Sequence, residues 1–167
     1  MPITIVWHGH ACFEIRNSVT VVIDPHDGSL GIKPPSAKAD IVLISHRHFD
    51  HANGLSYVKK NDTIVINQPG TYEVKGIKVT GIATYHDDSR GAKRGPNTVY
   101  AFEMEGIKFC HLGDLGHVLT EDQVNALKPI DVLMVPVGGV FTIDAKQADE
   151  VVKLLSLIHI SEPTRPL

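Results

Sequence analysis

Three imidazoles and one carboxylate fall within six residues, directly after the apolar run at 41–44. They belong to His46, His48, Asp50 and His51. Imidazole is the commonest protein ligand of zinc-like ions, and carboxylates bind the same ions as harder ligands. In an extended segment His46 and His48 point to one side, while Asp50 and His51 can turn toward a second position nearby. We therefore expect a buried strand whose end begins two metal sites.

Short apolar or alternating runs, separated by turn residues, dominate the first two-thirds of the chain. They predict a meander of strands over 3–7, 12–16, 20–24, 40–45, 63–67, 71–74, 77–85, 98–103, 107–112 and 131–137. A short helical turn is expected after His51. Thr120 begins a capping box for a later helix that Pro129 stops, and helical spacing of apolar residues predicts another helix over 144–155. This order predicts an α/β layered fold with sheets inside and helices outside.

Composition excludes several classes of protein. The chain has 167 residues, 43% apolar and 21% charged, as expected for one globular domain. Its net charge of −3 gives no overall attraction to nucleic acid or an anionic membrane. No stretch approaches membrane-spanning length, and the pair Cys12 and Cys110 favours a reducing compartment. We expect a cytoplasmic protein that acts on a small molecule, with no nucleic-acid or membrane partner and an open oligomeric state.

The motif His46-x-His48-x-Asp50-His51 resembles the signature of the metallo-β-lactamase superfamily. The resemblance extends to a branch of small metal-dependent hydrolases that includes ascorbate-phosphate lactonase-like proteins. Five further segments carry it: 9–13, 24–25, 86–91, 113–117 and 136–139. It implies a metallo-β-lactamase-like αββα sandwich, incomplete at the C-terminus, over residues 1–154.

The same resemblance implies the ligand set. His86, at a predicted strand end, completes a first site with the first two histidines of the motif. Asp114 bridges this site to a second one, which Asp50 and His51 also bind. Asp50 or Asp114 would orient the attacking water and pass a proton to the leaving group. The intact family implies two divalent ions; zinc is expected first, and a His/Asp set does not exclude manganese or iron.

One family ligand is missing from the sequence. In that branch the next strand ends in Pro-Met-His, whose histidine ligates the second metal, and this chain has no such element. Residues 155–167 resemble the translation of a sequencing adapter, so we expect a non-native tail and do not expect His159 to bind metal. The alternative is a natural strand over 157–160. With three ligands, the second site is predicted to be weak or empty.

Several other polar residues are candidates for contacts with substrate. They are His8, His10, Arg90, Arg94 and His117. The first two histidines flank Gly9 at a strand end, where turn residues need no function. The arginines lie in a loop beside His86 and would hold a phosphate or carboxylate, unless the loop is merely solvated. His111 is expected to be a core residue, and Asp24 to orient a ligand histidine.

The resemblance implies a hydrolase in which a metal-activated hydroxide attacks an ester, lactone or phosphoester bond. One alternative is a metal-binding protein with little or no turnover because of the truncation. Another is a nuclease similar to ribonuclease Z, which shares the metal core. The acidic balance and the absence of stretches that combine aromatic and basic residues argue against the nuclease.

Overall fold

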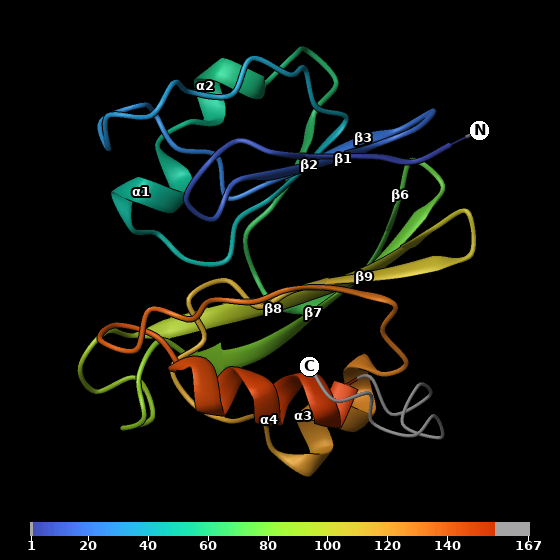
Figure 1. Cartoon of the computed structure of the whole chain (residues 1–167). Coiled ribbons are helices and arrows are strands. Elements are labelled where there is room, and N and C mark those ends of the chain that lie inside the picture. The colour runs from blue at the N-terminus through green and yellow to red at the C-terminus, as the bar shows by residue number, and fades with distance from the viewer. Residues whose placement is uncertain (1, 156–167) are drawn as a thin grey trace, which may run out of the picture.

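The computed structural model describes residues 2–155, in which two five-stranded β-sheets pack face to face between helices (Figure 1). The first sheet runs in the order β1 (Thr4–Trp7), β2 (Phe13–Arg16), β3 (Thr20–Ile23), β4 (Ile41–Leu43) and β5 (Ile64–Ile66). The second runs β10 (Val132–Met134), β9 (Ile107–His111), β8 (Pro96–Met104), β7 (Ile77–Tyr85) and β6 (Gly70–Val74). The predicted αββα sandwich is confirmed.

Each sheet combines antiparallel and parallel pairs. Strands β6 to β9 form the predicted antiparallel meander, and β1 to β3 form two hairpins. However, β4 and β5 run parallel to β3, and β10 runs parallel to β9. The chain therefore crosses over between these strands rather than turning back. All three residues of β4 are buried, as expected for a parallel strand covered on both faces.

Three clusters of buried side chains hold the four layers together. Alternate residues of β3 face opposite ways: Val21 and Ile23 enter the core between the sheets, while Val22 faces α2 (Leu55–Val58). Across the central core, the rings of Phe102 and Phe109 stack with centroids 5.3 Å apart. In a third cluster, side chains of α3 (Glu121–Leu127) and α4 (Ala145–Leu155) pack against the outer face of the second sheet.

The start of α3 follows local capping chemistry. The Thr120 side chain accepts a hydrogen bond from the backbone of Gln123, whose side chain accepts one from the Thr120 backbone, which confirms the predicted capping box. The short helix expected after His51 is α2. A further turn, α1 (Phe49–Ala52), starts earlier and carries Asp50 and His51.

The predicted tail at 155–167 lies outside the described residues except for Leu155, which is buried at the end of α4. His159 and the alternative strand over 157–160 also lie outside them. Within residues 2–155, no helix is both long enough and apolar enough to cross a membrane.

Candidate metal centre

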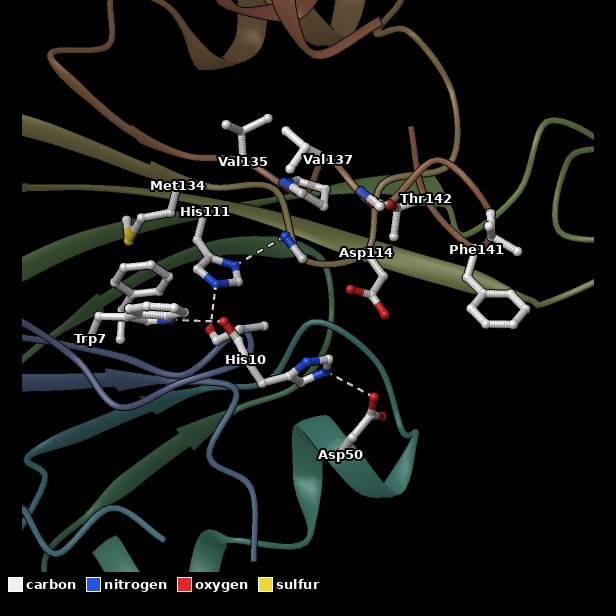
Figure 2. A pocket seen from close by; sticks show the side chains of 16 residues that line it. Trp7, His10, Asp50, His111, Asp114, Met134, Val135, Val137, Phe141 and Thr142 are labelled. Carbon is white, nitrogen blue, oxygen red and sulfur yellow. Dashed lines mark hydrogen bonds and ion pairs between the residues drawn. The ribbon is translucent and has the colours of Figure 1, made fainter. Parts of the chain in front are cut away.

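All six predicted ligands meet where strands of both sheets end. His46 and His48 follow β4, whereas His86 follows β7. Asp114 follows β9, and its carboxylate faces the helical turn α1 that carries Asp50 (Figure 2). The site is therefore built from strand ends that lie far apart in the sequence and that only the packing of the two sheets brings together.

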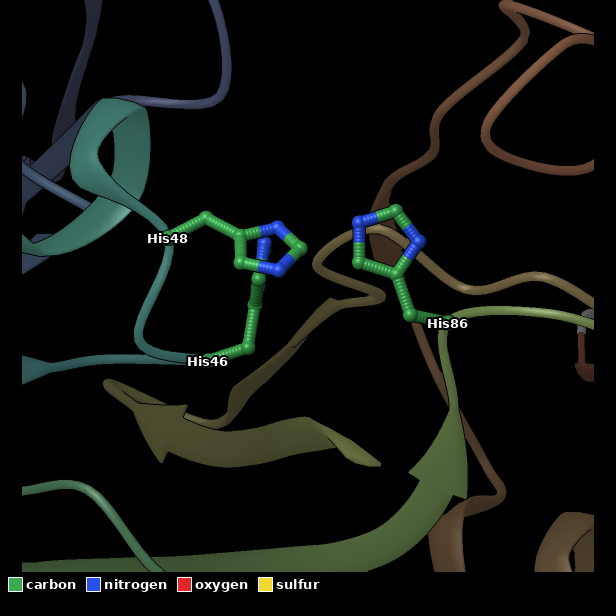
Figure 3. Close-up of side chains that lie close together, drawn as sticks. All are labelled: His46, His48 and His86. Carbon is green, nitrogen blue, oxygen red and sulfur yellow. The ribbon is translucent and has the colours of Figure 1, made fainter. Parts of the chain in front are cut away.

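His46, His48 and His86 form the first cluster, in which one nitrogen of each lies within 4.8 Å of the others. His46 and His48 come from one segment, and the His86 ring faces them from the end of β7 (Figure 3). Within residues 2–155, Nε2 of His46, which faces the cluster, is buried without a hydrogen-bond partner. Such an atom costs about 1–3 kcal/mol, and a divalent cation is a group that can satisfy converging imidazoles. The residues present thus fit a metal ion.

A buried hydrogen-bond chain orients His46. Oγ of Ser45 donates a hydrogen bond to Oδ2 of Asp24 at 2.6 Å. The same Oγ can therefore accept a hydrogen bond from Nδ1 of His46, which lies 2.8 Å away. The backbone N–H of Ser45 also donates to Asp24, at 2.7 Å. A proton on Nδ1 leaves the lone pair of His46 on Nε2, the atom that faces the cluster. Asp24 therefore acts on the metal centre through Ser45.

A second cluster lies beside the first and consists of His10, Asp50 and His51. One nitrogen or carboxylate oxygen of each residue lies within 4.8 Å of the others. Nδ1 of His51 donates to the Asp24 carboxylate at 2.9 Å, so Asp24 contacts one of the histidines predicted to be ligands. The other nitrogen of His51 lies 3.6 Å from Oδ2 of Asp50. This second cluster offers two imidazoles and one carboxylate to a cation.

Asp114 joins the two clusters. Its Oδ2 lies 3.0 Å from Nε2 of His51, 3.1 Å from Nε2 of His86 and 3.4 Å from Nε2 of His46. Asn97 accepts a hydrogen bond from its backbone N–H at 3.0 Å. The preceding Gly113 has φ +61°, and a Cβ there would collide with Asn97 and Ser45. Glycine therefore lets the Asp114 turn approach β4.

The charges of the centre are strongly coupled. Burial alone would raise the pKa of Asp114, but the imidazoles of His46, His51 and His86, which lie within 3.4 Å of its Oδ2, hold that pKa well below its usual range. Burial would lower the pKa of His51, but the carboxylates of Asp24 and Asp114 raise it to about 10. Without a cation the carboxylates are therefore balanced by protons on histidine, and metal binding must release protons.

The structure brings some of the candidate substrate contacts to the centre and not others. His10 lies in the second cluster. Nε2 of His8 is 2.8 Å from Glu14, away from the ligands. His117 uses both nitrogens locally, because Nδ1 donates to the Val118 carbonyl and Nε2 accepts from the Tyr85 N–H. Neither His8 nor His117 is therefore placed among the ligands.

The loop that follows His86 is organised by Asp87, a role that sequence reasoning missed. Its carboxylate accepts four backbone N–H bonds, at 2.8–3.0 Å, from Ser89, Gly91, Lys93 and Arg94. Burial raises the pKa of Asp87, but these bonds outweigh that effect and lower it to about 2. The Arg94 guanidinium lies 3.8 Å from the centre of the Phe141 ring, while Arg90 is exposed at φ +55°. Of the two arginines, Arg94 is thus the one held against another side chain, that of Phe141.

A cavity of about 650 Å³ opens beside the ligands (Figure 2). His10, Asp50 and Asp114 form its polar end. The rest is mainly apolar and includes Trp7, Phe13, Met134, Val137 and Phe141. Sequence reasoning missed these side chains, because single apolar residues at strand ends and in loops look like any others.

The chain matches known proteins over most of its length. Residues 4–160 match the family model described as the β-lactamase superfamily domain. A UPF0173 metal-dependent hydrolase of Thermoplasma acidophilum is 33% identical in an alignment that covers 90% of this chain and 78% of the relative.

Solved structures share the fold. One from Thermotoga maritima, described as a candidate Zn-dependent hydrolase of the metallo-β-lactamase superfamily, has 48% identity and a TM-score of 0.77, covering 92% of this chain and 71% of that one. The short form of human tRNase Z superimposes with a TM-score of 0.62 at 14% identity, covering 92% and 88%, which shows the fold alone. The chain belongs to the metallo-β-lactamase superfamily and, within it, to the branch of small metal-dependent hydrolases.

Proposed function

We propose that this chain hydrolyses an ester, lactone or phosphoester bond in a small molecule, with divalent cations held by the two clusters. The observation that carries the proposal is Asp114, whose Oδ2 lies within 3.4 Å of His46, His51 and His86 at once. When bound, the cations supply Lewis acidity and lower the pKa of water from ~16 to about 7.

The chain's own groups have separable roles in this proposal. The three imidazoles of the first cluster hold one cation, and Asp114 spans both positions. Asp50 and Asp114 are partly exposed, with 21% and 16% of their side chains accessible, so both can reach a water molecule. We assign them the orientation of the attacking water and the transfer of its proton to the leaving group.

The cavity walls support a substrate that has an apolar portion. Four large apolar side chains at its mouth remain exposed: Trp7 at 65%, Val137 at 59%, Val140 at 79% and Phe141 at 55%. Arg94 lies against Phe141 and adds a positive charge there. We therefore propose that Arg94 attracts an anionic group of the substrate, while the apolar part of the substrate lies against these four apolar side chains.

Zinc is the proposed metal, with manganese or iron as alternatives. A site rich in imidazole suits zinc, and the similar protein from Thermotoga maritima is described as a candidate zinc-dependent enzyme. We propose that the first site binds more tightly than the second, because the first cluster offers three imidazoles and the second offers two with a partly exposed carboxylate.

We propose a cytoplasmic location on the basis of the two cysteines. Cys12 and Cys110 are buried and form no disulfide within residues 2–155. Burial raises the pKa of the Cys12 thiol to about 12 and raises that of Cys110 as well, so both thiols are protonated and inert. Such cysteines suit a reducing compartment.

A hydrolysis screen tests the proposal. Metal-free protein, reloaded with zinc or manganese, is assayed on 4-nitrophenyl acetate, a γ-lactone, bis(4-nitrophenyl) phosphate and a precursor tRNA. We expect turnover of at least one small substrate, reduced ~100-fold or more by Asp114→Ala. Bound metal without turnover would instead favour a metal-binding protein, and cleavage of only the tRNA would favour the nuclease.

A further inference from the structure

We propose that His10 is a protein ligand of the second cation, together with Asp50, His51 and Asp114. The inference rests on the metal centre of the proposed function but concerns a residue outside the His-x-His-x-Asp-His motif. It gives the second site a fourth donor where the sequence provides three.

The first argument is convergence. Nε2 of His10 lies 2.9 Å from Oδ2 of Asp50 (Figure 2). The same nitrogen lies 3.2 Å from Nε2 of His51. That nitrogen of His51 lies in turn 3.0 Å from Oδ2 of Asp114. Two imidazole nitrogens and one carboxylate oxygen thus converge, and a second carboxylate lies beside His51. Four donors of these kinds form the usual tetrahedral set of zinc.

The second argument is the backbone of the turn that presents His10. Its φ of +51° lies in the left-handed region, which costs a residue other than glycine of order 1 kcal/mol or more. The neighbouring Gly9 has φ +89°, and a Cβ on it would lie 2.8 Å from Ile32. Backbone hydrogen bonds from Cys12 to Gly9 and from His8 to Cys12 close the turn. The fold therefore maintains an unfavourable conformation that directs His10 at the centre.

The third argument is that His111 ties this turn to the turn of Asp114. Its Nδ1 accepts from the N–H of Gly113 at 3.0 Å, which leaves the proton on Nε2 to donate to the Ala11 carbonyl at 2.9 Å. Ala11 follows His10, and Gly113 precedes Asp114. The Trp7 indole also donates to the His10 carbonyl at 2.9 Å. Buried His111 therefore fixes the spacing of two proposed ligands that lie 104 positions apart in the sequence.

The proposal is tested by titrating metal-free protein with zinc chloride in a calorimeter, with metal per chain checked by elemental analysis. The variant His10→Gly keeps the turn, because glycine favours positive φ. The control His8→Ala removes an imidazole two positions away that faces Glu14 instead. We expect two zinc sites in the wild type and in His8→Ala, and in His10→Gly a first site that is unchanged and a second weakened ~10–100-fold.

Two further measurements separate this inference from the proposed function. His48→Ala should weaken the first site, which does not involve His10. Cobalt(II) at the second site should show visible absorption bands that change in His10→Gly. His10→Asn, which also tolerates positive φ, replaces the glycine variant if that one fails to fold.

Each remaining outcome overturns the inference. A wild type that binds one zinc, lost in His48→Ala, would retain the first metal site of the proposed function and exclude His10 as a ligand. A second site of unchanged affinity in His10→Gly would show that His10 is only paired with Asp50. A wild type that binds no zinc would overturn both proposals.

Discussion

Asp24 and His51 form a completely buried pair, with Nδ1 of His51 2.9 Å from Oδ2 of Asp24 and neither side chain exposed to solvent. The same carboxylate also accepts from Ser45, which contacts His46. One residue outside the ligand motif thus orients an imidazole in each metal cluster. A carboxylate behind a ligand histidine fixes the tautomer and raises the basicity of the ring.

Replacing Asp24 with asparagine should weaken both metal sites. Asp24→Asn keeps the shape but removes the charge that orients both imidazoles, so we expect zinc affinity to fall ~10–100-fold by calorimetry. The matched control is Asp62→Asn, which alters a carboxylate that is 69% exposed. Equal zinc affinity in wild type and Asp24→Asn would show that Asp24 has no role in the centre.

Gly113→Ala should be much more destabilising than Gly106→Ala. Both glycines have positive φ, +61° and +77°, so both substitutions carry the backbone cost of about 1 kcal/mol. A Cβ at Gly113 also collides with Asn97 and Ser45, whereas at Gly106 it meets no described atom within 4 Å. We expect Gly113→Ala to cost about 2 kcal/mol or more by urea unfolding. Similar losses for both variants would contradict the close approach at Asp114.

Asp87→Asn should loosen the loop that holds Arg94. An amide has one acceptor oxygen, so it cannot replace both carboxylate oxygens, which together receive four backbone N–H bonds. Trypsin cleaves after Arg90, Lys93 and Arg94, and we expect this cleavage to be several-fold faster in the variant. Asp88→Asn, at a carboxylate that is 74% exposed, serves as the control. Unchanged digestion of Asp87→Asn would show that Asp87 does not organise the loop.

Glu14 should contribute stability that is lost in acid. Burial raises its pKa, but hydrogen bonds from Arg16 at 2.6 Å and His8 at 2.8 Å outweigh burial and lower it. Because the folded-state pKa lies below the unfolded value of about 4.3, the contribution is present above that pH and is lost as the pH falls through the folded pKa.

Unfolding of Glu14→Gln across pH 3–7 tests this sign. We expect a loss of about 1 kcal/mol at pH 7, limited because Arg16 is partly exposed, and a smaller difference from wild type near pH 3. A stability difference between wild type and Glu14→Gln that grows as the pH falls would mean that the folded state favours protonated Glu14.

Arg94→Ala should raise KM for an anionic substrate several-fold and leave kcat nearly unchanged, because Arg94 is proposed to attract the substrate rather than to react. Arg90→Ala is the control from the same loop, exposed and turned by its positive φ. An equal KM in wild type and Arg94→Ala would remove Arg94 from the substrate site.

The sequence predicts the parts of this site that depend on local pattern. The His-x-His-x-Asp-His motif at 46–51 follows an apolar strand, and that spacing predicts candidate ligands before any fold is known. The ends of β7 and β9 could be found because apolar runs stop there, although the roles of His86 and Asp114 came from the family resemblance. The four layers follow from the order of strands and helices.

The sequence could not distinguish His8 from His10. Both flank Gly9, and which imidazole faces the centre is decided by the left-handed φ of His10 and by the contact of His111 with Ala11, 100 residues away. The cavity has the same origin, because Trp7 and Phe141, far apart in the sequence, line one cavity only after both sheets have packed. Contacts between segments far apart in the sequence determine these features, and local sequence patterns do not predict such contacts.

The central claim is that His46, His48 and His86 hold a metal ion. The most direct test is the metal content per chain of protein purified without chelator, by elemental analysis, for wild type and His48→Ala. We predict at least one equivalent of zinc or manganese per folded wild-type chain and a large loss in the variant. A folded wild type without metal, or a variant that retains the full content, would contradict the assignment.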